Sequence, residues 1–276
     1  MSFLREKMNF VSKSIRGKIL IWFLLVALVP LVVSSLIIYN QSSQELIKKQ
    51  QDSFRSVVES KSQGMDQWLD RRMSEIKLAA MTETMQSLNP TWMTPYLKLI
   101  QEQSDVYESV GVAGLDGIVM ADSLEDAVGI ALKERDYFQK GMQGEPSYSD
   151  ILVSKATGNR IIVIASPIKA SDSKVIGLVY ATVNFESFIN TFLQQENSNI
   201  YITLVDEQNR LQHVASKELI GKSIDEAPYS EEYKTLLKSG KKETGSVTNT
   251  EAGIDYVIAY APIQGVCQVF CVNSIK

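Results

Sequence analysis

The side chains that most often carry out catalysis are scarce in this chain. His213 is the only histidine, and the two cysteines, Cys267 and Cys271, lie four residues apart in a stretch whose valine and phenylalanine content favours a strand. Four residues of strand separate two Cα atoms by about 13 Å, which is too far for a disulfide. A zinc site would need more ligands than these. We therefore expect no metal, no cofactor and cysteines that act as small buried hydrophobic residues.

Catalytic sequence motifs are absent as well. The chain contains no H-E-x-x-H zinc motif, no P-loop, no G-x-S-x-G elbow and no G-x-G-x-x-G turn. His213 follows a predicted turn, where a surface or strand-edge imidazole is commoner than a catalytic base. The sequence predicts a protein that is not an enzyme, with an anchored hydrolase as the less favoured alternative.

The charges of the chain are unevenly distributed. The first 18 residues carry five basic side chains and one acidic side chain, whereas the net charge of the whole chain is −4. The remainder therefore carries −8, which argues against the basic face that nucleic-acid phosphates require. We expect no nucleic-acid partner.

Residues 19–39 form an apolar stretch without a single charge, ILIWFLLVALVPLVVSSLIIY. About 20 helical residues span the roughly 30 Å hydrocarbon core of a bilayer, so this stretch predicts a transmembrane helix. A cleavable signal peptide is the alternative, but the apolar stretch is long for one and no A-x-A-like site follows. Basic residues flank its N-terminal side, which predicts a single-pass protein of the cell membrane with residues 1–18 in the cytoplasm and residues 40–276 outside.

Residues 40–105 predict a long stalk helix and a second, short helix. In the long helix, apolar residues recur at steps of three, four or seven. This stripe consists of Phe54, Val58, Met65, Leu69, Met73, Ile76 and Ala80. It would pack either against the domain that follows or against a second copy, and we expect a homodimer through the stalk helix. Asn89-Pro90 ends the pattern, and Thr94 as N-cap with Pro95 at the first position predicts a helix to about Gln103.

An eleven-residue phrase occurs twice beyond this helix. The chain reads GNRIIVIASPI at residues 158–168 and GIDYVIAYAPI at residues 253–263, with Gly, Pro and Ile in the same three places. Each copy follows an apolar strand, a turn that begins with an aspartate (Asp116 or Asp206) and a helical interval. The common order predicts two copies of one small antiparallel module, and hence an α+β fold.

Two such modules behind a transmembrane helix and a long helix resemble the double Cache sensor domains of bacterial receptors. The motifs that carry the resemblance are RDYFQKGMQG (135–144), YSD (148–150), SKATGNRIIVIASPI (154–168) and VIGLVYATVNFESF (175–188). The resemblance implies a PAS-like, membrane-distal module at residues 106–192 that binds a small-molecule ligand, and a membrane-proximal twin at residues 193–276. It also implies signal transduction across the membrane, as in chemotaxis.

The resemblance also implies a set of ligand-binding residues. In members that bind amines and amino acids, an arginine holds the ligand carboxylate, while aromatic residues and an aspartate surround its ammonium group. Arg135 matches that arginine, Tyr137 and Phe138 match the two aromatic residues after it, and Tyr148 and Asp150 match the Tyr-x-Asp pair. A guanidinium suits a carboxylate, and aromatic rings with a carboxylate suit a cation.

The chain departs from this pattern at four positions. Tyr137 stands where a tryptophan is usual, and Phe138 lacks the hydroxyl that is usual at its position. Ile130 stands where an upstream tyrosine is usual, and Asn184 stands where we place a second aspartate of the family on the late strand. Tyr107 and Lys155 are further candidates for the rim of the pocket.

Four of these residues also have a purely structural interpretation. Arg135 would begin a solvated helix, Tyr137 and Phe138 would belong to the core, and Asp150 would be a turn residue.

Receptors of this kind normally cross the membrane again and continue into a signalling module. No apolar stretch of about 20 residues follows Pro262. We therefore expect a truncated receptor product, or else a binding subunit that acts through a partner.

Overall fold

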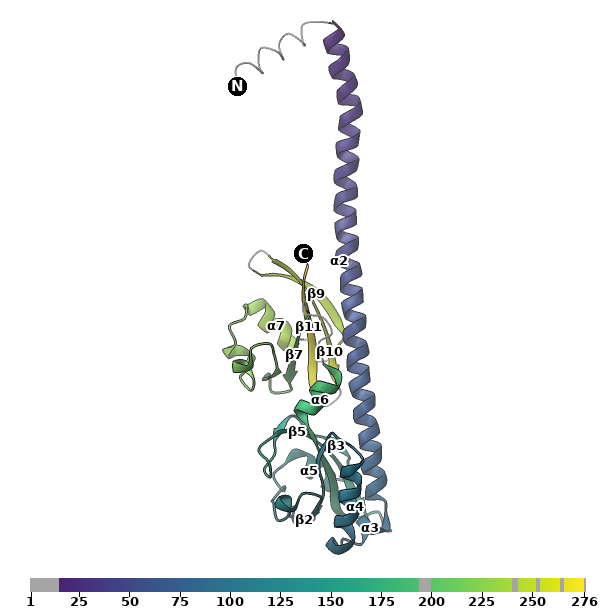
Figure 1. Ribbon diagram of the computed structural model, residues 1–276, viewed down its shortest axis with the longest axis vertical. Coiled ribbons are helices and arrows are strands. Elements are labelled where there is room, and N and C mark those ends of the chain that lie inside the picture. The colour runs from purple at the N-terminus through teal and green to yellow at the C-terminus, as the bar shows by residue number, and fades with distance from the viewer. Residues whose placement is uncertain (1–14, 194–199, 240–242, 252–253, 264–265, 276) are drawn as a thin grey trace. The chain divides into compact units, whose positions relative to one another are not determined.

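The computed structural model separates the chain into two compact units, residues 1–50 and 51–276. It describes residues 15–193, 200–239, 243–251, 254–263 and 266–275. The described part of the first unit belongs to the helix α2 (Ile15–Ala80), drawn in purple and blue in Figure 1. Among the described residues, α2 is the one helix long and apolar enough to cross a membrane, with a mean hydropathy of 2.4 over its most apolar window. The predicted transmembrane segment is thus helical.

In the second unit, the apolar stripe of α2 is buried inside the chain itself. Phe54 is partly buried, and the buried members are Val58, Met65, Leu69, Met73, Ile76 and Ala80. They share one hydrophobic cluster with strand residues of both modules, such as Val179 and Val269. The stripe therefore packs against the domain that follows it. A homodimer through this helix would have to use its other faces, and it stays a prediction.

The predicted short helix exists and ends at Gln103 as its C-cap, but its predicted start was wrong and a further short helix precedes it. After α2, Thr82 caps the short α3 (Glu83–Gln86), and Asn89 caps α4 (Pro90–Glu102) by accepting a hydrogen bond from the Thr91 backbone N–H at 3.0 Å. The helix thus begins at Pro90, five residues before the predicted first residue, Pro95. Asn89 and Pro90 supply both a strong N-cap and the favoured first residue, and Pro95 is accommodated in the second turn.

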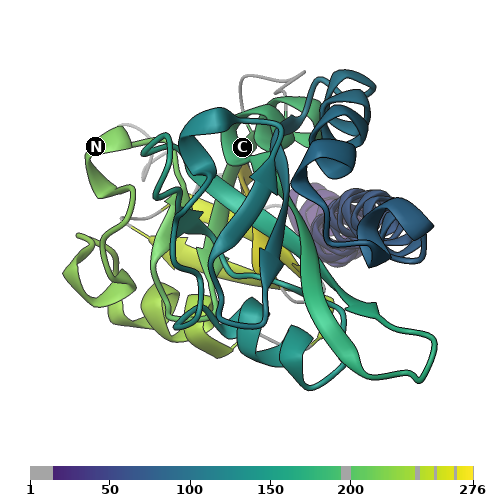
Figure 2. The same cartoon turned by 90° about the horizontal axis from the view of Figure 1, so that it is seen from below.

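The first module is an antiparallel sheet with the strand order β2-β1-β6-β5-β3 and with β4 paired to β5. Its elements are β1 (Tyr107–Gly114), β2 (Val119–Asp122), η1 (Glu125–Ala127), α5 (Asp136–Met142), β3 (Ser147–Tyr148), β4 (Leu152–Val153), β5 (Arg160–Lys169), β6 (Val175–Asn184) and α6 (Phe185–Phe192). Alternate residues of β5 enter two different clusters: Ile162 packs with α2 and α4, and Ile161 packs with α5. Both faces are therefore covered, which explains the nearly continuous apolar sequence of β5. Figure 2 shows α4 and the end of α2 on one side of this sheet.

The second module repeats this topology with the strand order β8-β7-β11-β10-β9. Its elements are β7 (Ile200–Asp206), β8 (Leu211–His213), η2 (Lys217–Leu219), η3 (Ile224–Glu226), α7 (Glu231–Ser239), β9 (Gly245–Glu251), β10 (Ile254–Ile263) and β11 (Cys267–Ile275). The phrase that occurs twice in the sequence forms β5 and β10, which occupy the same place in their sheets. The two-module α+β fold is confirmed.

The strand pairings fix which residues of the two modules correspond. Pro167 lies opposite Leu178 in the first sheet, and Pro262 lies opposite Gln268 in the second. One residue before Leu178, Gly177 lies opposite Gly114 on β1. One residue before Gln268, Cys267 lies opposite Asp206 on β7. The two prolines are therefore equivalent, as the sequence predicts.

The same pairings correct the match of the two turns. The Gly114 N–H donates to the Ile118 carbonyl at 3.0 Å, and the Asp206 N–H donates to the Arg210 carbonyl at 3.0 Å. Asp206 is therefore equivalent to Gly114 and not to Asp116. The aspartates begin similar turns, but they lie two residues apart in the aligned structures.

Candidate functional site

A cavity of about 40 Å³ lies in the first module, against the sheet face that α5 covers. It is lined by Ser109, Val119, Ala127, Ile130, Leu132, Arg135, Tyr137, Leu152, Val153, Ser154, Lys155, Ala156, Ile161, Val163, Tyr180 and Thr182. Most of its wall is aliphatic, and the polar groups gather at two places.

The first polar place is on the sheet, around a buried aspartate. The Tyr180 hydroxyl, which lines the cavity, donates to Asp122 Oδ2 at 2.6 Å, and the Leu124 backbone N–H donates to Oδ1 at 2.8 Å. Asp122 is 1 % exposed, and burial raises its pKa to about 6 although these hydrogen bonds favour the ionised form. The carboxyl group lies close to Gly111, where a Cβ atom would be only 2.5 Å from the Tyr180 hydroxyl.

Two further hydroxyls continue this polar wall. The Ser109 hydroxyl lies 3.4 Å from Asp122 Oδ2 and 3.2 Å from the Thr182 hydroxyl, and the Ser109 backbone N–H donates to Thr182 at 2.8 Å. Ser109 and Thr182 both line the cavity, so it has three hydroxyl groups on its sheet side.

The second polar place carries positive charge. Arg135, at the N-cap position of α5, donates to the Val153 carbonyl at 3.3 Å, and Lys155 donates to the Ala131 carbonyl at 2.7 Å. Among the described residues that line the cavity, none is acidic. Beside Arg135, Tyr137 is buried, and burial raises its pKa to about 12, so the ring presents a neutral phenol.

A separate cleft of about 450 Å³ lies between the two modules. It is lined by Glu134, Arg135, Asp136, Tyr137, Lys140, Ser147, Tyr148, Ser149, Asp150 and Leu152 of the first module and by Glu207, Gln208 and Arg210 of the second. Arg135 and Tyr137 thus line both the cavity and the cleft, whereas Tyr148 and Asp150 line the cleft alone. The Tyr148 hydroxyl donates to Asp70 on α2 at 3.0 Å.

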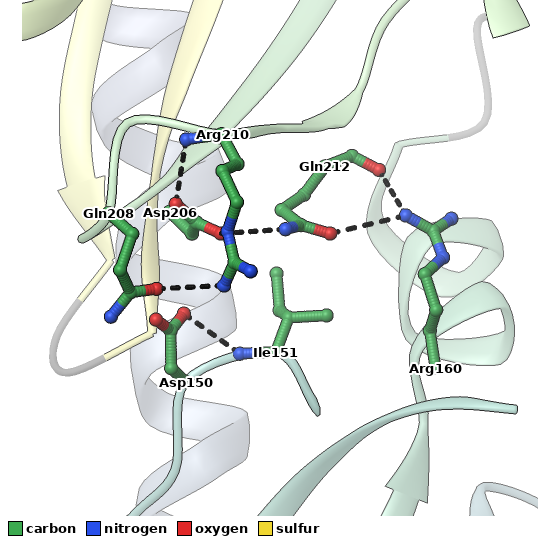
Figure 3. A network of polar contacts seen from close by, with 7 residues as sticks. All are labelled: Asp150, Ile151, Arg160, Asp206, Gln208, Arg210 and Gln212. Atoms are coloured by element: carbon green, nitrogen blue, oxygen red, sulfur yellow. Dashed lines mark hydrogen bonds and ion pairs between the residues drawn. The ribbon is translucent and has the colours of Figure 1, made fainter. Parts of the chain in front are cut away.

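Asp150 faces a polar network of the second module (Figure 3). Its Oδ1 accepts from the Ile151 backbone N–H at 2.8 Å. Burial raises the pKa of the Asp150 carboxyl to about 6, and the negative charge of Asp206 acts in the same direction, while Arg210 opposes it. Asp206 is itself fixed by Arg210 at 2.9 Å and by Gln212 at 2.7 Å.

The remaining predicted residues do not line the cavity, with two exceptions. Phe138 is buried in the core beneath α5, and Asn184 caps α6 by accepting from the Ser187 N–H at 3.0 Å. The Tyr107 hydroxyl donates to Glu75 on α2 at 2.9 Å. Ile130 and Lys155, in contrast, line the cavity.

Five polar residues at the cavity were missed as site residues by the sequence analysis: Ser109, Asp122, Ser154, Tyr180 and Thr182. The internal repeat held a signal for two of them. The pairings make Val214 equivalent to Asp122 and Phe270 equivalent to Tyr180, so one module has a polar pair where its twin has an apolar pair. A polar residue whose repeat partner is apolar is a candidate for function.

His213 and Cys267, the residues with catalytic potential, do not line the cavity. His213 ends the edge strand β8; burial lowers its pKa and the charge of Arg160 acts in the same direction, while Glu186 opposes them. Cys267 is a buried free thiol, and the Cys271 side chain lies outside the described residues. No group of three or more His, Cys, Asp or Glu residues in the described part of the chain could hold a metal ion.

Comparisons with known proteins agree with this architecture. The family model described as Cache domain matches residues 39–269. No curated protein sequence matches the chain. The sensor domain of the Vibrio cholerae histidine kinase DctB has a TM-score of 0.62 at 15 % identity, covering 82 % of this chain and 97 % of that one.

Two chemoreceptor structures are similar to a comparable degree. The ligand-binding domain of Pseudomonas fluorescens CtaA, in complex with L-serine, has a TM-score of 0.63 at 17 % identity and covers 82 % of this chain and 98 % of its own. The ligand-binding domain of Pseudomonas aeruginosa PctB, in complex with L-Arg, has a TM-score of 0.61 at 14 % identity and covers 83 % and 96 %.

Proposed function

Because this chain belongs to the Cache domain family, we propose that it is an extracytoplasmic sensor whose first module binds a small carboxylate in the cavity beside Tyr180. One observation carries the proposal: Arg135 and Lys155 are the charged groups among the described lining residues, and no acidic residue accompanies them. The amino-acid complexes of CtaA and PctB support a small-molecule ligand at this fold.

The cavity offers complementary groups for both ends of such a ligand. A guanidinium can hold a carboxylate through two parallel hydrogen bonds, and Lys155 adds a point charge. The weak 3.3 Å contact from Arg135 to the Val153 carbonyl can be exchanged for a charged acceptor. The aliphatic wall, including Ile161 and Val163, then covers the hydrocarbon part of the ligand.

An amino acid is the second candidate, and its ammonium group distinguishes the two. That group needs acceptors, and Asp122, a carboxylate beside the cavity, already accepts from Tyr180 and Leu124. Ser109 and Thr182 leave only neutral hydroxyls for an ammonium. The geometry therefore favours a ligand with a carboxylate and an apolar body.

The proposal includes the membrane. Residues 19–39 would cross the bilayer, with residues 1–18 in the cytoplasm, the first module distal to the membrane and the second proximal to it. The charge-free helix behind a basic flank supports this orientation. A homodimer through the outer faces of α2 remains part of the proposal.

A change in the first module has a polar route to the second. Arg160, at the start of β5, donates to the Gln212 backbone carbonyl at 2.6 Å, and Gln212 donates to Asp206 (Figure 3). Arg160 also lies 4.8 Å from the ring centre of Phe185 and pairs with Glu186, both on α6. We assign to these contacts the coupling of the cavity to the second module.

Ligand binding to the chain in lipid nanodiscs tests the proposal. Isovalerate and propionate should raise the melting temperature, because a ligand that binds only the folded state stabilises it by about 2.7 kcal/mol at a hundredfold excess over Kd. The isosteric amides should not do so. Arg135→Ala should abolish the shift, and Arg71→Ala, at an exposed arginine on α2, should leave it unchanged.

Two results would count against this site. Carboxylate binding that survives Arg135→Ala would place the ligand elsewhere. Binding that is lost in Asp150→Ala, but not in a variant of Thr182, would place it in the cleft between the modules.

A further inference from the structure

The second module contains a pocket of its own, of about 270 Å³. It is lined by Tyr201, Thr203, Val214, Ala215, Tyr229, Tyr233, Asn249, Tyr256 and Ile258. Four of these residues are tyrosines, and the described lining residues include no carboxylate, ammonium or guanidinium group.

This pocket lies where the cavity lies in the first module. Thr203 lies opposite Phe270 on β11, just as Gly111 lies opposite Tyr180 on β6, so Thr203 and Gly111 occupy equivalent positions. Two residues earlier on each strand, Tyr201 is therefore equivalent to Ser109 of the cavity. The same comparison makes Ile258 of β10 equivalent to Val163 of β5, another residue of the cavity. Each site also takes a tyrosine from the helix of its own module.

The chemistry of the two sites is different. The buried Asp122–Tyr180 pair beside the cavity is replaced by Val214 and Phe270, which are buried hydrophobic residues. An anionic ligand in the second pocket would lose hydration without gaining a counter-charge, which is costly. The pocket therefore suits a neutral ligand.

The tyrosines give this pocket a specific shape. The rings of Tyr229 and Tyr233 meet edge to face, with centres 5.1 Å apart and planes at 77°. Burial raises the pKa of Tyr229, so its phenol stays neutral. Tyr256 lies opposite Asn249 on the neighbouring strand, and this amide adds a donor and an acceptor to an otherwise aromatic wall.

We propose that this pocket is a second ligand site, for a neutral aromatic small molecule that carries one hydroxyl or amide group. Aromatic ligands gain from edge-to-face and stacked contacts with tyrosine rings in addition to the burial of apolar area. The proposal goes beyond the carboxylate site, since it concerns the other module and a ligand without charge. Either site can fail its test without affecting the other.

Titration of the full chain in nanodiscs with p-cresol tests the proposal, with empty nanodiscs as the reference for partition into lipid. We expect saturable binding by the protein. Benzoate is an aromatic probe with a negative charge, and it should bind at least about tenfold more weakly because it finds no counter-charge. Equal binding of benzoate, or the absence of saturable p-cresol binding, would overturn the proposal.

Variants locate the site. Tyr229→Ala should weaken p-cresol binding by about tenfold, because it removes one wall, whereas Tyr229→Phe keeps the ring and should change it by no more than about twofold. Ala215→Trp, at an exposed position of the lining, should block the pocket without altering the core, which keeps the test valid if Tyr229→Ala does not fold. Binding that falls with Arg135→Ala and survives Ala215→Trp would place p-cresol in the first module and refute the assignment.

Discussion

The buried pair Asp122–Tyr180 supports a prediction about stability that can be worked out from the two modules. Tyr180→Phe removes a 2.6 Å hydrogen bond to a carboxylate that is almost fully buried. Hydrogen bonds to charged groups contribute about 2 kcal/mol, and the carboxylate left with fewer donors keeps its desolvation cost. We expect Tyr180→Phe to lower the free energy of unfolding by about 2 kcal/mol at pH 7.

The double variant Asp122→Val/Tyr180→Phe should be less harmful than the single one. It reproduces the Val214–Phe270 pair of the second module, and replacing both partners by apolar groups of similar shape is nearly neutral. We expect it to lie within about 1 kcal/mol of the unmodified chain, so the effects of the two substitutions should be strongly non-additive. Urea unfolding of residues 51–276, the second compact unit, measures both values.

The pH dependence gives an independent check on the same pair. The folded chain holds the Asp122 proton up to about pH 6, whereas the unfolded chain releases it near pH 3.8. Asp122 therefore makes the free energy of unfolding fall as pH rises through this window, by about 3 kcal/mol. Tyr180→Phe should steepen the fall, and the double variant should remove the share due to Asp122 while the share due to Asp150 remains. Equal slopes in all three proteins, or a double variant less stable than Tyr180→Phe, would refute the reasoning.

Three further predictions concern other parts of the chain. Gly111→Ala should destabilise the protein by more than about 2 kcal/mol, because its Cβ would collide with the buried pair, whereas Gly64→Ala, with nothing within 4 Å on α2, should stabilise it by about 0.5–1 kcal/mol in urea unfolding. His213 has a lowered pKa, so stability is lost as pH falls below about 6.5, and His213→Gln should flatten that decline in melts between pH 5 and 7 while ligand binding stays the same. Impermeant thiol reagents applied to intact cells should label a cysteine introduced at Gln41 but not at Ser2; the reverse pattern would invert the topology.

The fold could be predicted from the sequence to a large extent because its signals are local and occur twice. The strand that contains Pro167 is marked by its apolar run and by the equivalent strand that contains Pro262. The apolar stripe on α2 follows from helical periodicity. The surface that it packs against cannot be predicted in this way, because a second copy of the chain and the chain's own modules would both present apolar side chains to it. The start of α4 was misplaced because two N-cap and proline signals lie five residues apart, and only the packing of the helix selects the first.

The site was less predictable because its key contacts join distant residues. Asp122 and Tyr180 are 58 positions apart, and neither stands out in a strand of mixed polarity. Asn184 was expected at the ligand, but it ends β6 and caps the next helix, and Thr182, two residues earlier on the same face, lines the cavity. Side chains two residues apart point to the same face of a strand, so the sequence pattern allowed either Asn184 or Thr182 to reach the cavity. Only the length of β6 decides which of them does.

A crystal structure of residues 51–276 with isovalerate tests the central claim most directly, because it locates the ligand instead of inferring its position. The carboxylate should lie against the Arg135 guanidinium at about 2.8 Å, with the branched hydrocarbon end against Ile161 and Val163. Isovalerate bound in the cleft beside Asp150 with the first-module cavity unchanged, or no bound ligand at concentrations that raise the melting temperature, would contradict the account.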